Sequence, residues 1–394
     1  MFLLKIKKER MKRMDFSLTR EQEMLKKLAR QFAEIELEPV AEEIDREHVF
    51  PAENFKKMAE IGLTGIGIPK EFGGSGGGTL EKVIAVSEFG KKCMASASIL
   101  SIHLIAPQAI YKYGTKEQKE TYLPRLTKGG ELGAFALTEP NAGSDAGAVK
   151  TTAILDSQTN EYVLNGTKCF ISGGGRAGVL VIFALTEPKK GLKGMSAIIV
   201  EKGTPGFSIG KVESKMGIAG SETAELIFED CRVPAANLLG KEGKGFKIAM
   251  EALDGARIGV GAQAIGIAEG AIDLSVKYVH ERIQFGKPIA NLQGIQWYIA
   301  DMATKTAAAR ALVEFAAYLE DAGKPFTKES AMCKLNASEN ARFVTNLALQ
   351  IHGGYGYMKD YPLERMYRDA KITEIYEGTS EIHKVVIARE VMKR

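Results

Sequence analysis

The chain carries two hydrophobic periods, and they are segregated along the sequence instead of alternating. Helical spacing dominates residues 17–129, short β-rich runs fill 131–233, and helical spacing returns from 242 to the end. Alternating strands and helices would predict a parallel, doubly wound sheet, whereas segregated elements predict an α+β fold. We therefore expect a helical N-terminal domain, a β-barrel-like middle domain and a C-terminal four-helix bundle.

These changes in hydrophobic period predict three domains, at 15–130, 131–241 and 242–394, after a disordered basic N-terminus at 1–14. Thr19 and Gln22 have capping-box spacing, and apolar residues follow at helical spacing. Those residues are Met24, Leu25, Leu28, Phe32 and Ile35. Further helices are expected at 54–62, 79–93, 95–113, 116–128, 242–279, 291–322, 327–352, 361–373 and 380–392.

Seven strands are expected in the middle region, separated by turn signals such as Asn165-Gly166. They span 133–137, 151–155, 162–164, 179–184, 196–200, 207–211 and 224–228. A Gly-x-Gly-x-x-Gly match at Gly173, Gly175 and Gly178 leads into a strand and not a helix, so it does not predict a dinucleotide site.

Composition excludes several classes of protein. Four scattered cysteines without a Cys-x-x-Cys pair argue against disulfides and structural zinc, and we expect no metal. The longest apolar run, 179–185, is far short of a membrane span. Residues 1–13 carry a net charge of +5, out of +4 for the whole chain, so the remainder is nearly neutral and nucleic-acid binding is not expected. We interpret the basic start as a solvated terminus, with a targeting segment as the alternative.

Two segments of the β-region suggest a flat cofactor. Phe-Ala-Leu-Thr-Glu-Pro-Asn-Ala-Gly-Ser-Asp at 135–145 offers the Thr138 and Ser144 hydroxyls and free backbone N–H groups, which suit a planar ring or an anion. Phe170 and Ser172 lie two residues apart on an expected strand, so an aromatic face and a hydroxyl share one side. Taken singly, a capped turn and a core phenylalanine are the simpler interpretations.

Two segments of the helical C-terminal region suggest charge chemistry. Arg282 lies in a loop between two long helices and could bind a pyrophosphate bidentately, through two of its guanidinium nitrogens. Glu377, in Ile-Tyr-Glu-Gly-Thr-Ser-Glu-Ile at 375–382, has apolar neighbours that would raise its pKa toward neutrality, as suits a general base. The simpler interpretations are a solvated loop charge and a helix-terminal carboxylate.

Together with Gln-Ile-His-Gly-Gly at 350–354, these motifs resemble the acyl-CoA dehydrogenase family over residues 15–394, most closely its short-chain, butyryl-CoA type. The resemblance implies FAD-dependent conversion of short-chain acyl-CoA thioesters to trans-2-enoyl-CoA. Glu377 would remove the α-proton while the β-hydride passes to flavin N5. It also implies an electron-transferring flavoprotein as partner, a homotetramer built as a dimer of dimers, and a cytoplasmic location, with the mitochondrial matrix as the alternative.

The same resemblance implies two sets of contacts. Those to FAD are Phe135, Leu137, Thr138, Ser144, Phe170, Ser172, Arg282, Gln293, Gln350, Ile351, His352, Gly353, Gly354, Thr379, Ser380 and Glu381. Those to the substrate are Ser144, Asp254, Gly255, Ala256, Arg257 and Gly378. Arg282, Gln293 and 350–354 would reach FAD on a neighbouring subunit.

Three positions refine the expectation. The family usually has tryptophan where this chain has Phe170. Branched- and long-chain relatives place their base at the position of Ala256, which leaves Glu377 as the base here. Glutaryl-CoA dehydrogenases carry an arginine where this chain aligns Ala97, so a dicarboxyl substrate is disfavoured.

Rival functions remain at this point. An enoyl-CoA reductase would run the same site in reverse with an electron-transferring flavoprotein. An acyl-CoA oxidase would be longer, and a nitroalkane oxidase would have Asp at Glu377. A non-catalytic scaffold would be expected to lose Glu377.

Overall fold

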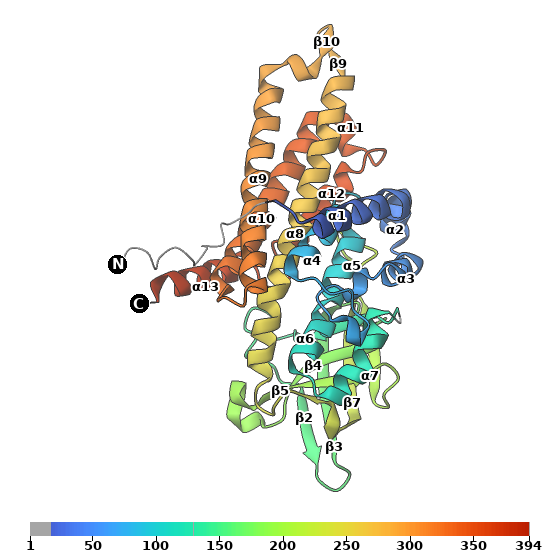
Figure 1. Cartoon of the computed structure of the whole chain (residues 1–394), viewed down its shortest axis with the longest axis vertical. Helices are drawn as coiled ribbons and strands as arrows, with labels where there is room; N and C mark the ends of the chain where they lie inside the picture. The colour runs from blue at the N-terminus through green and yellow to red at the C-terminus, as the bar shows by residue number, and fades with distance from the viewer. Residues whose placement is uncertain (1–16, 129, 394) are drawn as a thin grey trace, which may run out of the picture.

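The computed structural model describes residues 17–128 and 130–393, so the predicted disordered segment 1–14 lies outside the described residues. The β-sheet occupies one end of the elongated molecule, and helices form the other end (Figure 1). The long helix α8 (Gly245–Glu281) connects them, because it starts beside the sheet and runs to the far tip of the helical end.

One helix expected in the N-terminal region is divided in the structure. Residues expected as one helix over 95–113 form α5 (Met94–His103) and α6 (Ile105–Tyr113). Pro107 explains the break, because proline lacks an N–H group and clashes with the carbonyl four residues earlier. The remaining elements are α1 (Arg20–Phe32), η1 (Ala33–Leu37), η2 (Glu38–Val40), α2 (Ala41–Glu47), α3 (Ala52–Glu60), η3 (Leu63–Gly65), η4 (Lys70–Phe72), α4 (Thr79–Gly90) and α7 (Lys116–Thr127).

Helix α1 begins with the predicted capping box, in which Thr19 and Gln22 exchange backbone-to-side-chain hydrogen bonds of 2.9 and 3.2 Å. Its periodic apolar residues do not all face the core. Phe32 is buried and stacks on Phe89, whereas Met24, Leu28 and Ile35 are exposed. The five residues therefore form two stripes, only one of which packs inward.

The stretch Met94–Tyr113 is long and apolar enough to cross a membrane by length and composition alone. It comprises α5 and α6, and 89% of its window is buried inside the structure. This burial is the pattern of a core helix, so the stretch is weak evidence for a membrane segment.

All seven predicted strands are present in one mixed sheet of order β6-β7-β3-β2-β4-β5-β8, and β1 pairs in parallel with β4. One face of β4 packs on α6, α7 and α8, while its other face enters a core made by strand residues and their neighbours. The sheet therefore curls over its own core, as the β-barrel-like prediction requires. The strands are β1 (Gly133–Ala136), β2 (Thr152–Asp156), β3 (Glu161–Ser172), β4 (Val179–Leu185), β5 (Met195–Glu201), β6 (Phe207–Val212), β7 (Thr223–Pro234) and the unpredicted β8 (Leu238–Leu239), with η5 (Pro188–Gly194) and η6 (Ala235–Asn237) between them.

In the C-terminal region, α8, α9 and α10 pack against one another, and α12 and α13 pack on α10. Between α8 and α9 lies a small hairpin whose two turn residues, Phe285 and Gly286, both have positive φ, as a two-residue hairpin turn requires. The other elements are β9 (Ile283–Gln284), β10 (Lys287–Pro288), η7 (Ile289–Asn291), α9 (Gln293–Asp321), α10 (Thr327–His352), α11 (Gly354–Tyr357), α12 (Leu363–Ile372) and α13 (Ser380–Met392).

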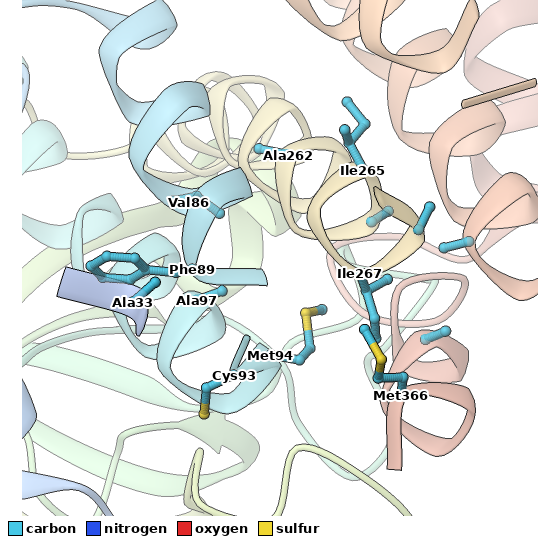
Figure 2. Close-up of a cluster of buried hydrophobic side chains, with 14 of the residues drawn as sticks. Ala33, Val86, Phe89, Cys93, Met94, Ala97, Ala262, Ile265, Ile267 and Met366 are labelled. Carbon is cyan, nitrogen blue, oxygen red and sulfur yellow. The ribbon is translucent and has the colours of Figure 1, made fainter. Parts of the chain in front are cut away.

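The N-terminal and C-terminal helices share one hydrophobic core. Figure 2 draws Val86 and Phe89 of α4, Ala97 of α5, Ala262 of α8 and Met366 of α12 as members of one cluster of buried hydrophobic side chains. Because α5 packs on α8, α12 and β1, it connects the helical core to the sheet. Helix α5 therefore lies between the sheet, which carries Phe170 and Ser172, and the helices that surround Glu377.

Candidate active site

Glu377 lies in the turn between α12 and α13, and the backbone there is unusual. Glu377 has φ 53° and Gly378 has φ 102°, so two successive residues adopt left-handed conformations. Such a conformation is unfavourable for a residue with a side chain and is found where surrounding contacts enforce it. Here Thr379 caps α13 by accepting a hydrogen bond from the Ile382 N–H at 3.4 Å.

Two long-range contacts hold the residues on either side of Glu377. The Tyr376 hydroxyl donates to Gln263 Oε1 of α8 at 2.5 Å. Lys334 Nζ of α10 donates to the Gly378 carbonyl at 2.6 Å. The carboxylate of Glu377 is thereby fixed from both sides of its own backbone.

Burial raises the pKa of Glu377 to about 7, while Lys334, Lys82 and Arg257 act in the opposite direction. All three cations are buried. The Oε2 atom of Glu377 is buried and has no hydrogen-bond partner within the described part of the chain. The site therefore holds a carboxylate that ionises near neutrality and has a free oxygen, which is the condition a general base needs.

The predicted substrate segment of α8 lies beside this carboxylate. Arg257 donates to Asp254 Oδ1 at 2.5 Å, and the Thr327 hydroxyl donates to Asp254 Oδ2 at 2.6 Å. The Gly255 carbonyl accepts a hydrogen bond from Lys82 Nζ at 3.1 Å, and Ala256 is buried. Ala256 carries no carboxylate and both oxygens of Asp254 are paired, whereas Glu377 Oε2 has no hydrogen-bond partner among the described residues.

On the sheet, Phe170 presents an exposed aromatic face. Its φ is 56°, and the pairing of β3 with β7 shifts register between Lys168 and Ile171. Bulges of this kind redirect side chains, and Phe170 is 64% exposed while Ile171 is buried. Ser172, two residues further along β3, is half-buried and lines a small cavity. An exposed ring and a nearby hydroxyl suit a flat ring with polar edges, although phenylalanine offers less area than tryptophan.

The loop after β1 is held by a buried ion pair. Lys168 Nζ donates to Glu139 Oε1 at 2.7 Å and to the Leu137 carbonyl at 3.0 Å. Glu139 also accepts from the Lys150 and Thr151 N–H groups at 2.6 and 3.0 Å. Both ends of the 138–151 loop are thus tied to β3.

The predicted contacts of this loop lie at different depths. Leu137 is buried, Thr138 and Phe135 are half-buried, and Ser144 is exposed. The Thr138 carbonyl accepts from the Cys169 N–H at 3.0 Å, directly before Phe170. The loop and the exposed ring are therefore neighbours, as a shared flat ligand would require.

Helix α5 connects this face to Glu377. Ile99 and Ile102 line a small cavity with Ser172. Ser98, on the same helix, lies 3.4 Å from the Ser221 hydroxyl and interacts with Tyr376, the residue before Glu377. The predicted flavin face and the predicted base thus flank one helix. Ala97 is wholly buried in the apolar core and brings no charge to it.

A second group of predicted contacts lies at the opposite end of the molecule from the sheet (Figure 1). A cavity of about 570 Å³ there is lined by Arg282 and by Ile351, His352, Gly353 and Gly354. A Cβ at Gly353 or Gly354 would meet no atom within 4 Å, so a ligand could approach the backbone closely. The structure does not bring these residues together with Phe170 and Ser172, which lie on β3 at the sheet end of the chain (Figure 1).

The remaining predicted residues are placed as follows. Gln293 and Gln350 are exposed and do not line this cavity. The ring of His352 is buried against Tyr278 at 4.0 Å, so this histidine has a packing role. At the start of α13, Ser380 is buried and Glu381 is exposed.

The sequence analysis did not assign a role to the residues that hold the predicted site segments in place, which are Lys82, Lys334, Lys168, Glu139 and Gln263. Lys82, Lys334 and Lys168 are all buried. A lysine on the apolar side of a helix or strand was the available signal, because charged side chains are rarely buried without a specific partner. Residues 17–128 and 130–393 contain no group of three or more His, Cys, Asp or Glu that could hold a metal ion.

Comparisons with known proteins cover almost the whole chain. Three family models match in order: the acyl-CoA dehydrogenase N-terminal domain at 19–155, middle domain at 134–231 and C-terminal domain at 243–392. The short-chain specific acyl-CoA dehydrogenase of Clostridium acetobutylicum is 54% identical over 381 residues, covering 96% of this chain and 100% of that protein. The mitochondrial short-chain specific acyl-CoA dehydrogenase of Mus musculus is 48% identical over 94% of this chain and 90% of that protein.

Solved structures match equally well. Butyryl-CoA dehydrogenase from Megasphaera elsdenii is 46% identical with a TM-score of 0.94, covering 96% of this chain and 100% of that one. A chain in the structure described as the electron transferring flavoprotein of Acidaminococcus fermentans is 51% identical with a TM-score of 0.95, covering 97% and 100%. This chain therefore belongs to the acyl-CoA dehydrogenase family of flavoprotein oxidoreductases.

Proposed function

We propose that this enzyme is an FAD-dependent dehydrogenase of short-chain acyl-CoA thioesters in which Glu377 is the α-proton base. The observation that carries the proposal is the Glu377 carboxyl itself, whose pKa burial raises to about 7 and whose Oε2 has no hydrogen-bond partner among the described residues. A base with a pKa near the working pH combines a large ionised fraction with a useful affinity for the proton.

FAD fits the residues present, since the exposed Phe170 ring lies next to the 138–151 loop and the half-buried Ser172 follows two residues later on β3. When bound, FAD would supply the two-electron acceptor for the hydride that leaves the β-carbon. The chain's own task is to bind the thioester, remove the α-proton with Glu377 and stabilise the developing enolate. We assign that stabilisation to the Glu377 backbone N–H.

The distal cavity supports an oligomer. Arg282 and the open backbone at Gly353 and Gly354 would contact the FAD of a neighbouring subunit, because they lie far from Phe170 in their own chain. We propose an oligomer on this ground, and a homotetramer from the family resemblance, with Gln293, Gln350, Thr379, Ser380 and Glu381 as further FAD contacts. We also propose that the chain divides into domains at 15–130, 131–241 and 242–394.

The partner and location follow from the relatives. A neighbour described as an electron transferring flavoprotein supports such a flavoprotein as the electron partner. Bacterial and mitochondrial relatives both match, and the four cysteines are free. A reducing compartment, the cytoplasm of a bacterium, fits both observations.

Anaerobic titration of the holoenzyme with butyryl-CoA tests the proposal. We expect bleaching of the flavin absorbance to a stoichiometric end point, and no bleaching by glutaryl-CoA, since Ala97 offers no charge to a second carboxylate. An enzyme that butyryl-CoA leaves oxidised would contradict it.

The reverse reaction, enoyl-CoA reduction, is the second candidate. It is favoured by the same neighbour, whose description concerns flavin-based electron bifurcation. Crotonyl-CoA reduction and butyryl-CoA oxidation should be measured with one electron-transferring flavoprotein as mediator. The ratio of the two rates at physiological potential decides the direction.

A further inference from the structure

Lys334 is a buried cation that the proposed chemistry does not use. It lies on α10 with no exposed surface, between the buried residues Cys333 and Ala337 of the same helix. Within the described part of the chain, its Nζ donates one hydrogen bond, to the Gly378 carbonyl at 2.6 Å. Burying an ammonium group is costly unless it is paired, so its single short contact, one residue from Glu377, calls for an explanation.

That contact holds a backbone under strain. Glu377 and Gly378 both have positive φ, and Lys334 binds the carbonyl of the second of these two residues. The direction of the Glu377 side chain depends on the turn. A cation that fixes the Gly378 carbonyl therefore also fixes where the carboxylate points.

Charges from every neighbouring element act on Glu377. The cations are Lys334 on α10, Lys82 on α4 and Arg257 on α8, and Lys334 has the largest effect of the three. Arg257 is already paired with Asp254, and Lys82 donates to the Gly255 carbonyl. Lys334 is thus the strongest charge that opposes the effect of burial on this carboxylate.

The other ionisable neighbours contribute less. On α13, burial lowers the pKa of His383 to about 3, so this histidine is neutral throughout the working range. Glu374, in the same turn as Glu377, is paired with Arg342 at 2.7 Å and with Lys371 at 2.5 Å. Glu381 is exposed at the start of α13. None of these groups replaces Lys334 beside the Glu377 carboxylate.

We propose that Lys334 is a positioning residue for proton transfer: its ammonium group orients the Glu377 carboxylate through the Gly378 carbonyl and keeps that carboxylate ionised near neutral pH. The inference rests on the proposed role of Glu377. The α-proton passes from the substrate carbon to Glu377, while Lys334 keeps its own proton and exchanges none with the substrate.

The test is the pH dependence of kcat/KM for butyryl-CoA in the FAD-loaded enzyme, which reports ionisations of the free protein. Lys334→Met removes charge and hydrogen bond, whereas Lys334→Gln removes the charge and keeps a donor. An opposite charge close to a carboxyl typically shifts its pKa by about 1 to 3. Both variants should therefore move the acidic limb upward by about one pH unit or more, and lower kcat/KM roughly fivefold at pH 7.

Activity at high pH separates the effect of the Lys334 charge from the effect of its hydrogen bond to the Gly378 carbonyl. The pKa of Lys334 is lowered to about 8, chiefly by burial, so above pH 9 the wild-type lysine is itself uncharged. There Lys334→Gln should approach the wild-type kcat/KM, while Lys334→Met should remain lower because the Gly378 carbonyl has lost its donor. Lys334→Arg, which keeps the charge, should retain the wild-type limb.

Lys371→Met is the matched control, because it removes a lysine from the same turn region whose partner is Glu374. Its limb should coincide with that of the wild type. An unmoved limb in Lys334→Gln, or a uniform loss at all pH values, overturns the inference; the Gln and Arg variants decide it if Lys334→Met does not fold. Failure of the proposed function is distinguishable, because it would appear as an active Glu377→Gln variant regardless of Lys334.

Discussion

Removing the charge of Lys168 should destabilise the loop that carries the predicted flavin contacts. Lys168 is wholly buried and Glu139 is 7% exposed, with 2.7 Å between Nζ and Oε1. Burial alone would raise the pKa of Glu139, but Lys168 and two backbone donors outweigh it and hold that pKa below its usual value. Burial lowers the pKa of Lys168. In Lys168→Met, the Glu139 carboxylate remains in the interior without its cation.

The loss in the free energy of unfolding follows from the groups that lose Lys168 as their partner. Removing one partner of a buried ion pair typically costs about 3–5 kcal/mol, and the Leu137 carbonyl also loses its 3.0 Å donor. The Lys150 and Thr151 N–H groups still bind Glu139 and offset part of this loss. We therefore expect the free energy of unfolding to fall by about 3 kcal/mol at pH 7, with loss of retained FAD because the 138–151 loop is released.

Urea unfolding at fixed FAD and protein concentration measures this change, since bound cofactor and oligomerisation contribute to apparent stability. The double variant Lys168→Met/Glu139→Gln removes both charges and should recover about 2 kcal/mol relative to Lys168→Met. A loss below about 1 kcal/mol in the single variant would refute this reasoning, as would a double variant no more stable than the single one.

Three further predictions concern the active site and its assembly. Because burial raises the pKa of Glu377 from 4.5 to about 7, the folded state binds an extra proton between these values and loses stability as the pH rises through them; Glu377→Gln should therefore be more stable than wild type at pH 8, by on the order of 2 to 3 kcal/mol, and similar at pH 4, as urea midpoints would show. Arg282→Ala should lower both the flavin-to-protein ratio and the tetramer fraction in size-exclusion chromatography, and loss of FAD from an unchanged tetramer would disprove the link to assembly. The buried Ile99, Leu100 and Ile102 on α5 should limit acyl length, so kcat/KM should peak at four to six carbons: each buried methylene adds about 0.8 kcal/mol, until displacing packed side chains costs about 1–3 kcal/mol. A rate that still rises through dodecanoyl-CoA would contradict that limit.

The fold could be predicted wherever one hydrophobic period persists. The positions of α8, α9 and α10 follow from long helical patterns, and those of β4 and β5 from short apolar runs. The sequence predicted a strand at 162–164 and, separately, a strand around Phe170 and Ser172, whereas the structure has one continuous strand β3 over Glu161–Ser172. Its register shifts near Leu164 and after Lys168 interrupt the period of two, so the alternation signal ends before the strand does.

The site could be predicted only where residues lie within one motif. Glu377, Phe170 and Arg282 have chemically distinctive neighbours in the sequence. The contact of Lys334 with Gly378 joins positions 44 residues apart on two elements, and no local pattern encodes that pairing. Met24 and Leu28 show the opposite error, because helical spacing marks an apolar stripe without saying which stripe the neighbouring helices cover.

The most direct test of the account is the rate of flavin bleaching when butyryl-CoA is mixed anaerobically with Glu377→Gln and with the wild-type enzyme, at equal FAD content. Glutamine keeps the size and polarity of the side chain but cannot accept the α-proton. General base catalysis typically contributes about 10²–10⁴-fold, so bleaching should slow at least a hundredfold while FAD binding and the oligomer persist. Bleaching within about tenfold of the wild-type rate would show that another group removes the proton and would contradict the central claim.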